Sequence, residues 1–122
     1  MAKIIKSAFS ILFLIILLGT SAVEVKAQCL ESLRRARTVY DEGRLHEIYD
    51  VLKDCLEGKD LNNEEKTEAY RLIILSYIYQ DQPDLADQAM LDLLKANPLY
   101  DTDDATDPNE LINLYNTFLT DP

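Results

Sequence analysis

The sequence predicts an all-α fold, and three observations support this prediction. Apolar residues recur with the period of a helix through most of residues 28–122. Strand signals are absent from that stretch, and the whole chain has only three glycines and four prolines. The few breakers fall between the periodic segments, so they divide the stretch into five short helices.

The clearest periodic segment runs from Glu64 to Pro98 and predicts two antiparallel helices. The apolar stripe of the first half follows the i, i+3, i+4, i+7, i+8 pattern, with Tyr70, Ile73, Ile74, Tyr77 and Ile78. The second half repeats it with Leu85, Ala86, Ala89, Met90, Leu93 and Leu94. At the break between them we expect Asp81 or Gln82 to cap the second helix and Pro83 to occupy its first turn. Because so short a connection forces the helices antiparallel, the segment is a helical hairpin.

Another hairpin is expected before this one. Its helices are predicted over Cys29 to Glu42 and Leu45 to Leu56, with Gly43 ending the first. The inward residues of the second helix would be Leu45, Ile48, Tyr49, Leu52, Cys55 and Leu56. The two hairpins are offset by 38 residues, counted from residue 28 to residue 66.

A fifth helix follows an acidic connector over Leu99 to Thr106. Its start is predicted at Asp107-Pro108-Asn109-Glu110, with Asp107 as the cap and Pro108 in the first position. Its apolar stripe is Leu111, Leu114, Tyr115 and Phe118. Since no sixth helix pairs with it, we expect it to pack on the second hairpin as a C-terminal capping helix.

The segment from Glu64 to Pro98 also resembles a tetratricopeptide repeat. Tyr70 and Tyr77 match the aromatic positions of the first helix, and Ala86 matches the small position where the second helix crosses it. Ile74 and Leu93 depart from the small residues usual there. The first hairpin matches through Ala36 and Gly43 and departs at Arg35 and Ile48, and its offset exceeds the ~34 residues of an ideal repeat.

The order of the whole chain is similar to a module at the N-terminus of exported Bacteroidetes envelope proteins, often ahead of an outer-membrane β-barrel or other envelope domain. The resemblance covers the mature chain, and its most specific part is the pairing of NPLY with the later DPNELINLY. It implies an adaptor that binds another envelope protein or peptide during cell-envelope assembly. An alternative is a truncated product that has lost a downstream envelope domain.

Residues 1–27 are typical of a signal peptide. Lys3 and Lys6 precede an apolar run from Ile11 to Leu18, which is too short to span a membrane comfortably. Cleavage is expected before Gln28, which leaves a 95-residue helical domain over residues 28–122. The rival interpretation is a lipoprotein anchored at Cys29, but Gln28 stands where such a site needs a small residue. We therefore expect export to the periplasm or outer membrane without insertion of the mature chain.

The charge balance and the residue types exclude several function classes. The net charge of −10 becomes −12 without the leader, so nucleic acid and anionic lipid surfaces would be repelled. His46 is the one histidine, and no serine has a nucleophile-elbow context. Two cysteines with one histidine are too few for a zinc site. We expect no enzyme activity, no cofactor and no metal.

The acidic connector supports an alternative function, a calcium-dependent or enzyme-accessory binding protein. Its residues Asp101, Asp103, Ala105 and Asp107 have the odd spacing of a calcium loop. The glycine of the sixth position is missing, and Ile112 stands where a bidentate glutamate belongs. A solvated linker therefore explains the acids better than a calcium site.

The two cysteines are predicted to form a disulfide. Export places them in an oxidising compartment. Cys29 begins the first helix and Cys55 ends the second, so an antiparallel hairpin brings them side by side. The alternative is two buried free thiols.

The partner-binding surface is predicted from the repeat register. In a tetratricopeptide-like stack the first helix of each hairpin lines the concave side. The residues placed there are Leu33, Arg37, Tyr40, Glu68, Arg71, Leu75, Ile78 and Tyr79. Aromatic and apolar groups beside arginines suit a peptide or helix. The competing interpretation is that the final helix, Asn109 to Leu119, covers these residues and makes them core.

Overall fold

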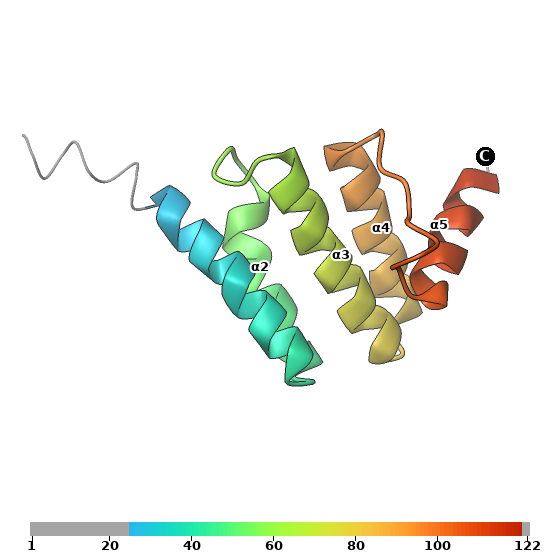
Figure 1. The fold of residues 1–122 in the computed structure, drawn as a ribbon, viewed down its shortest axis with the longest axis horizontal. Coiled ribbons are helices and arrows are strands. Elements are labelled where there is room, and N and C mark those ends of the chain that lie inside the picture. The colour runs from blue at the N-terminus through green and yellow to red at the C-terminus, as the bar shows by residue number, and fades with distance from the viewer. Residues whose placement is uncertain (1–24, 121–122) are drawn as a thin grey trace, which may run out of the picture.

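The structure, a computed structural model, describes residues 25–120, and within this range it consists of helices joined by loops (Figure 1). The N-terminal helix covers residues 25–41. It is followed by the 3-10 turn η1 (Leu45–Glu47), α2 (Ile48–Leu56), α3 (Asn63–Tyr79), α4 (Pro83–Ala96) and α5 (Asn109–Thr120). No strand occurs in the described range, so the predicted all-α class is confirmed.

The helices stand in a row, with the N-terminal helix at one end and α5 at the other (Figure 1). The N-terminal helix pairs with α2, and α3 pairs with α4. The central member is α3, which contacts α2, α4 and α5. The contacts between the first pair and the rest of the row are therefore made mainly through α3.

The turn of each pair has the same backbone hydrogen bonds. At the first turn the Arg44 amide donates to the Val39 carbonyl and the Gly43 amide to that of Tyr40, which is the Schellman pattern. Gly43 has a φ of +78°, a left-handed conformation suited to glycine, so its predicted role is confirmed. At the second turn Asp81 occupies the equivalent position with a φ of +58°. The two turns lie 38 residues apart, which equals the offset expected for the hairpins.

The start of α3 is fixed by a capping box that the sequence analysis did not identify. The Asn62 side chain accepts a hydrogen bond from the Glu65 amide at 2.9 Å, and the Glu65 carboxylate accepts one from the Asn62 amide at 2.8 Å. Leu61, immediately before it, is buried and anchors the preceding loop to the core. The start of α4 agrees with the prediction, since Pro83 occupies the first turn, and Gln82 holds the cap position without a side-chain hydrogen bond.

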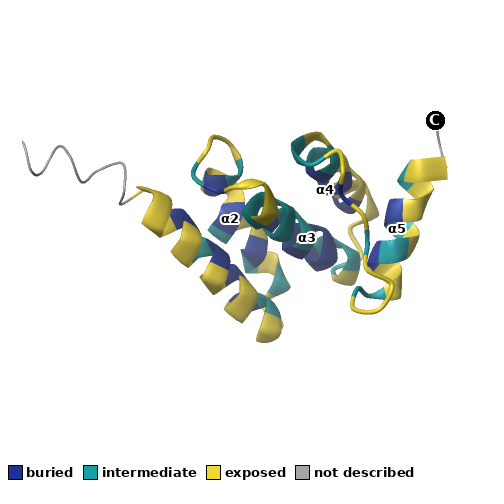
Figure 2. Cartoon of the chain, turned by 45° about the horizontal axis from the view of Figure 1, so that its top comes forward, coloured by how far each residue is buried: buried dark blue, intermediate teal, exposed yellow. Residues whose placement is uncertain are grey.

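The core follows α3, which is buried on most of its circumference (Figure 2). Six of the eight residues from 69 to 76 are buried, including Ile73, Ile74 and Leu75. A helical segment that is buried on most sides belongs in the interior of a stack. The buried positions 36, 48, 52 and 55 recur 38 residues later as the buried positions 74, 86, 90 and 93.

The connector between α4 and α5 is fixed to the core by two polar contacts. The Tyr115 hydroxyl donates to the buried carbonyl of Tyr100 at 2.8 Å, and the two rings meet edge to face with centroids 5.5 Å apart. The Asp107 carboxylate, predicted to cap α5, instead accepts from the Arg71 guanidinium at 2.6 Å and the Asp103 amide at 2.7 Å. The Pro108 carbonyl accepts hydrogen bonds from the amides of Leu111 and Ile112 in the first turn of α5.

The N-terminal helix begins earlier than predicted. Residues 25–28 are already helical, so the start at Cys29 is wrong. The helix thus includes Val25-Lys26-Ala27, the proposed cleavage site, because none of these residues breaks a helix. The remainder of the predicted signal peptide, residues 1–24, lies outside the described residues. Within residues 25–120, no helix is long and apolar enough to cross a membrane.

Candidate functional site

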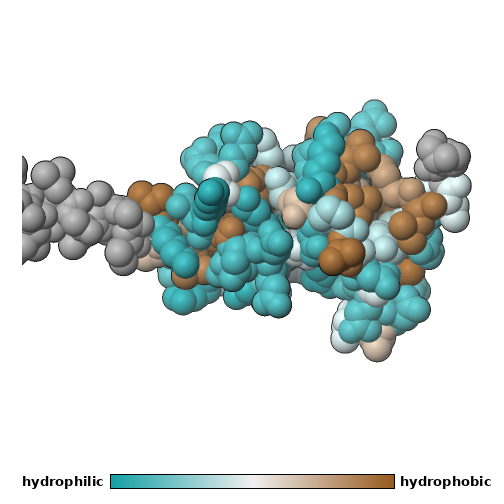
Figure 3. Space-filling view, turned by 90° about the horizontal axis from the view of Figure 1, so that it is seen from above, coloured by the Kyte–Doolittle hydropathy of each residue, from teal (hydrophilic) through white to brown (hydrophobic). Residues whose placement is uncertain are grey.

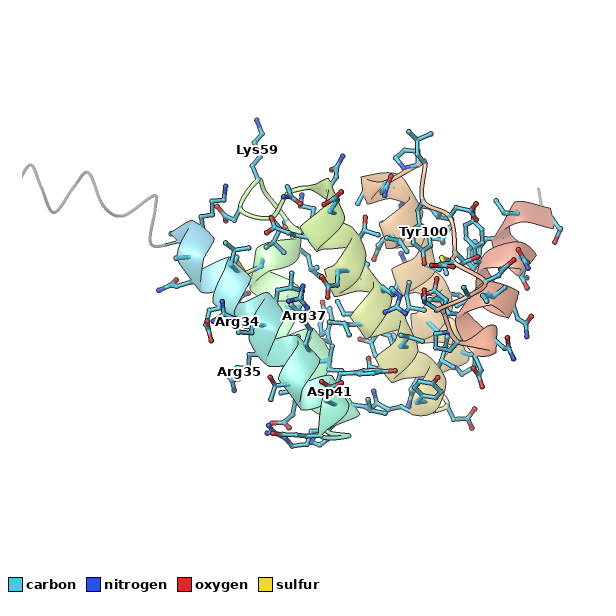
Figure 4. The ribbon with its side chains drawn as sticks, in the orientation of Figure 1. Arg34, Arg35, Arg37, Asp41, Lys59 and Tyr100 are labelled. Atoms are coloured by element: carbon cyan, nitrogen blue, oxygen red, sulfur yellow. A yellow bond between two sulfur atoms is a disulfide. The ribbon has the colours of Figure 1, made fainter. Side chains whose placement is uncertain are left out.

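The predicted concave face is partly assembled where the N-terminal helix meets α3. The Arg37 guanidinium donates two hydrogen bonds to the Glu68 carboxylate, which ties the two helices together and raises the pKa of Arg37. Arg37 lies on the side of its helix that faces α3, whereas Arg34 and Arg35 lie on the other side (Figure 4). The structure therefore brings together residues that are 31 positions apart in the sequence.

Two aromatic residues of the same face also meet across these helices. Burial raises the pKa of the Tyr40 hydroxyl, and the neighbouring Tyr79 hydroxyl raises it further. Tyr79 is 46% exposed, while Tyr40 and Ile78 are half-buried against the core. Tyr79, which is not part of the apolar stripe predicted for this helix, is therefore the most exposed of the three.

Three of the predicted face residues have other roles. Leu33 and Leu75 are only 2% and 1% exposed, so they belong to the core and offer no contact surface. Arg71 binds Asp107, and 30% of its side chain is exposed. Arg71 is engaged by Asp107 of the connector, and α5 lies at the opposite end of the row from the N-terminal helix (Figure 1). The competing interpretation applies in part to Ile78, which lines a small pocket together with Leu114 of α5. The accessible part of the face is thus Arg37, Tyr40, Glu68, Ile78 and Tyr79, which we call the Tyr79 face.

A second candidate surface, missed by the sequence analysis, lies between α2, α3 and α4. It is a groove of about 320 Å³, and we call it the tyrosine groove. Its walls are Tyr49, Lys53, Leu56 and Glu57 from α2, Tyr70, Ile73 and Tyr77 from α3, and Leu85, Gln88, Ala89 and Asp92 from α4.

The tyrosine groove and the Tyr79 face lie on opposite sides of α3. Each residue of an α-helix is turned by ~100° from the previous one. On α3 this places Tyr70, Ile73 and Tyr77 within one narrow sector. Glu68, Leu75 and Tyr79 of the predicted concave face are each two positions from one of these residues, so they are turned away from the sector by ~160°.

The aromatic residues of the groove show where the sequence analysis was incomplete. Tyr70 and Tyr77, which were predicted to lie on the apolar stripe of this helix, pack against the core, but both also line the groove. Tyr49 was expected to point inward and is 45% exposed, with its ring centroid 6.5 Å from that of Tyr77. The available signal was its residue type, because a tyrosine at the edge of an apolar stripe can keep its hydroxyl in water.

The charges of the groove are predominantly negative. Lys53 is paired with the nearby Asp50 at 3.5 Å, whereas neither Glu57 nor Asp92 forms an ion pair with another residue of the range 25–120. Burial raises the pKa of Tyr70, and the Asp92 and Glu57 carboxylates raise it further because a tyrosinate beside them would be repelled. Both carboxylates therefore act on the Tyr70 end of the groove.

The acidic connector uses its carboxylates within the chain. Asp103 accepts hydrogen bonds from the Ala105 amide and the Thr106 hydroxyl, which lower the pKa of its carboxyl group. Asp107 is engaged by Arg71, and Asp101 accepts from the adjacent Thr102 amide. Among residues 25–120, no three His, Cys, Asp or Glu side chains are grouped so that they could hold a metal ion. His46 is exposed in η1.

Cys29 and Cys55 are joined in the structure by a disulfide. Their Cα atoms lie 5.6 Å apart, and both residues are buried. The bond connects the N-terminal helix to α2 at the end of the pair opposite the Gly43 turn. The structure thus contains the predicted cysteine pair, in the arrangement expected for an antiparallel hairpin.

Apolar side chains are unevenly distributed over the outside of the molecule. Seen from above, the part formed by the N-terminal helix and α2 is mostly hydrophilic, and apolar side chains gather over α4, α5 and their connector (Figure 3). The exposed leucines of α4, α5 and their connector are Leu85, Leu91, Leu99 and Leu119.

No protein-family model, curated protein or solved structure matches this chain. Its candidate function therefore rests on its own residues and contacts.

Proposed function

We propose that this protein is an exported, non-enzymatic protein–protein interaction module that acts as an adaptor in cell-envelope assembly. Its partner would be another envelope protein or a peptide segment of one. The observation that carries the proposal is the Tyr79 face, where partly exposed aromatic and apolar side chains from two rigid helices lie beside a fixed arginine.

The arrangement of the helices supports a tetratricopeptide-like module. Two helical pairs have equivalent turns at Gly43 and Asp81, and their buried positions repeat with the same 38-residue offset. Stacked helical pairs of this kind present extended surfaces to which a partner can bind. The first helices of the two pairs supply the residues of the Tyr79 face, as the resemblance implies.

The composition of the Tyr79 face suits binding of a protein. Tyrosine and arginine are enriched among the residues that dominate binding energy at protein interfaces. Arg37 is held by Glu68, so its guanidinium loses little conformational freedom when a partner covers it. The Arg37 side chain remains 49% exposed in this ion pair, so a partner can still contact it.

The disulfide supports the proposed location. Disulfides persist in oxidising compartments, and a leader at residues 1–27 would deliver the chain to one. The strongly negative net charge would keep the module away from anionic lipid head groups and nucleic acid. Intact-mass measurement of the exported protein tests this part: a chain that starts at Gln28 without an acyl chain on Cys29 is expected.

The interaction is tested with two matched substitutions. Tyr79→Ala removes an aromatic group that is 46% exposed, and Tyr49→Ala removes one that is 45% exposed on the opposite side of α3. The wild-type and variant proteins are used as baits in envelope extract, and bound proteins are identified by mass spectrometry. We expect Tyr79→Ala to weaken capture of the principal partner about tenfold, the loss of an interface residue worth ~1.4 kcal/mol, with an unchanged melting temperature.

Tyr49→Ala should retain the partner of the Tyr79 face. Equal capture of that partner by wild type and Tyr79→Ala would contradict the proposed surface. The proposed surface would also be contradicted if Tyr79→Ala lowered the melting temperature and lost binding only to the extent that the protein was unfolded. A photo-crosslinking amino acid at position 79 identifies the partner directly, because it reacts only with groups that touch this position.

A further inference from the structure

The tyrosine groove has features of a binding site that the proposed partner of the Tyr79 face does not use. Three helices form its walls, so its shape is set by the packed core. Its volume of about 320 Å³ lies at the lower limit of small-molecule pockets, which fits a few side chains of a peptide better than a cofactor. Exposed apolar groups on its rim, Tyr49 and Leu85, are 45% and 47% exposed.

The two ends of the groove differ in chemistry. Because α2 and α4 both run antiparallel to α3, Tyr70 lies at the same end as Glu57 and Asp92. Tyr77 lies at the other end with Tyr49 and Leu85. The first end is aromatic and acidic, and the second is aromatic and apolar, with Ile73 and Ala89 forming the floor between them.

The charge at the acidic end favours a cationic occupant. Lys53 is paired with Asp50, and Asp92 accepts a hydrogen bond at 3.1 Å from the neutral Gln88 amide, so no cation among residues 25–120 is paired with Glu57 or Asp92. An arginine satisfies this end better than a lysine does. Its planar guanidinium can stack on the Tyr70 ring and hydrogen-bond to a carboxylate through two N–H groups.

The length of the groove fixes the spacing of the occupant's side chains. Tyr70 and Tyr77 are seven positions apart on α3, which corresponds to about 10 Å along the helix axis. An extended peptide advances by ~3.3 Å per residue, so about three residues separate groups bound at the two ends. The apolar end would then receive an aliphatic side chain between Tyr77 and Leu85.

We propose that the tyrosine groove binds an extended segment of a partner protein in which an arginine and an aliphatic residue are about three positions apart. The arginine occupies the end formed by Tyr70, Glu57 and Asp92, and the aliphatic side chain occupies the end formed by Tyr49, Tyr77 and Leu85. This site is separate from the Tyr79 face, and either can exist without the other.

The test uses defined decapeptides and the isotope-labelled oxidised protein. The peptide GSGRAALGSG carries arginine and leucine three positions apart, and two matched peptides replace the arginine with glutamate or place the leucine next to the arginine. Amide chemical shifts in NMR spectra report where each peptide binds. We expect shifts centred on the groove residues of α2, α3 and α4 for the first peptide, with at least tenfold weaker binding of the other two.

Substitutions assign the two ends. Leu85→Ala should weaken binding about fivefold and Asp92→Asn about tenfold, the loss of one charge-assisted hydrogen-bonded pair. Leu91→Ala is the control for the first, since Leu91 is 40% exposed on the same helix but does not line the groove. Asp54→Asn is the control for the second, because Asp54 is an exposed acid of α2 outside the groove. Both controls should change binding less than twofold.

Several results would overturn the proposal. One is the absence of shifts at groove residues with the arginine peptide at millimolar concentration. Another is equal binding of the glutamate peptide, which would show that charge does not select the occupant. A third is dimerisation of the free protein in sedimentation velocity that Leu85→Ala abolishes and Leu91→Ala does not, since this would assign the groove to a second copy of the chain.

Discussion

The contact between Tyr115 and Tyr100 yields a pair of substitutions with opposite effects on stability. The Tyr115 hydroxyl donates to the buried Tyr100 carbonyl at 2.8 Å, so Tyr115→Phe removes this bond and leaves a buried acceptor without its donor. The Tyr100 hydroxyl is itself buried, and no donor or acceptor among residues 25–120 pairs with it. Tyr100→Phe therefore removes a polar group that folding has taken from water without compensation.

The magnitudes follow from the cost of unpaired buried groups. Tyr115→Phe should lower the free energy of unfolding by about 1.5 kcal/mol, and Tyr100→Phe should raise it by about 1 kcal/mol. Both variants keep the rings that pack edge to face with centroids 5.5 Å apart, so the stability difference between each variant and wild type contains no loss of ring packing. For a domain of this size each kcal/mol shifts the melting temperature by roughly 4–8 °C.

Urea unfolding of the oxidised protein, followed by circular dichroism, measures both values. The slope against urea should be the same in wild type and variants, which shows that the unfolded state is unchanged. A loss of stability in Tyr100→Phe comparable to that in Tyr115→Phe would refute the reasoning. It would mean that the Tyr100 hydroxyl is satisfied in solution and contributes to the connector as Tyr115 does.

Three further predictions concern stability. Burial raises the pKa of Tyr100 to about 12, so the folded state keeps this proton at pH values where the unfolded state has lost it. The free energy of unfolding should therefore fall by about 2 kcal/mol between pH 10 and pH 12. Urea titrations across this range should show a smaller fall for Tyr100→Phe. Replacing Cys29 and Cys55 by serine should lower the free energy of unfolding by roughly 3 kcal/mol, since the bond closes a loop with a sequence separation of 26. Equal stability of this variant and the oxidised protein would exclude the bond. Asp81→Gly should stabilise the protein by about 1 kcal/mol and Gly43→Ala should destabilise it by a similar amount, because both positions have positive φ. Melting temperatures that change in the same direction for both variants would contradict this.

Helix positions were predictable because the information for them is local. Apolar periodicity and breakers located the helical segments that begin at Leu45 and Pro83 and the turn at Gly43. The start of the N-terminal helix was misplaced, and α5 begins at Asn109 instead of at the predicted first residue Pro108. The cysteine pair was also predictable, since the antiparallel arrangement of two adjacent helices brings Cys29 and Cys55 together. Asn62 and Glu65 carry a capping-box signal that was present in the sequence and overlooked.

The site was less predictable because it depends on distances between helices. Periodicity identifies Leu75 as apolar, but only the packed structure shows that it is buried instead of facing a partner. The ion pair between Arg71 and Asp107 joins residues 36 positions apart, and no local pattern indicates it. The tyrosine groove is a space that α2, α3 and α4 leave between them, so its existence depends on side-chain volumes across three helices.

The disulfide and the Gly43 turn together close the first helical pair into a covalent ring. Peptide bonds connect the two helices at one end, and the Cys29–Cys55 bond connects them at the other. A single cut in the exposed turn, for example by trypsin after Arg44, would therefore leave the two helices in one molecule. The turn is thus a site where the chain can be cut while the disulfide still joins the two helices, or where a segment can be inserted without opening the ring.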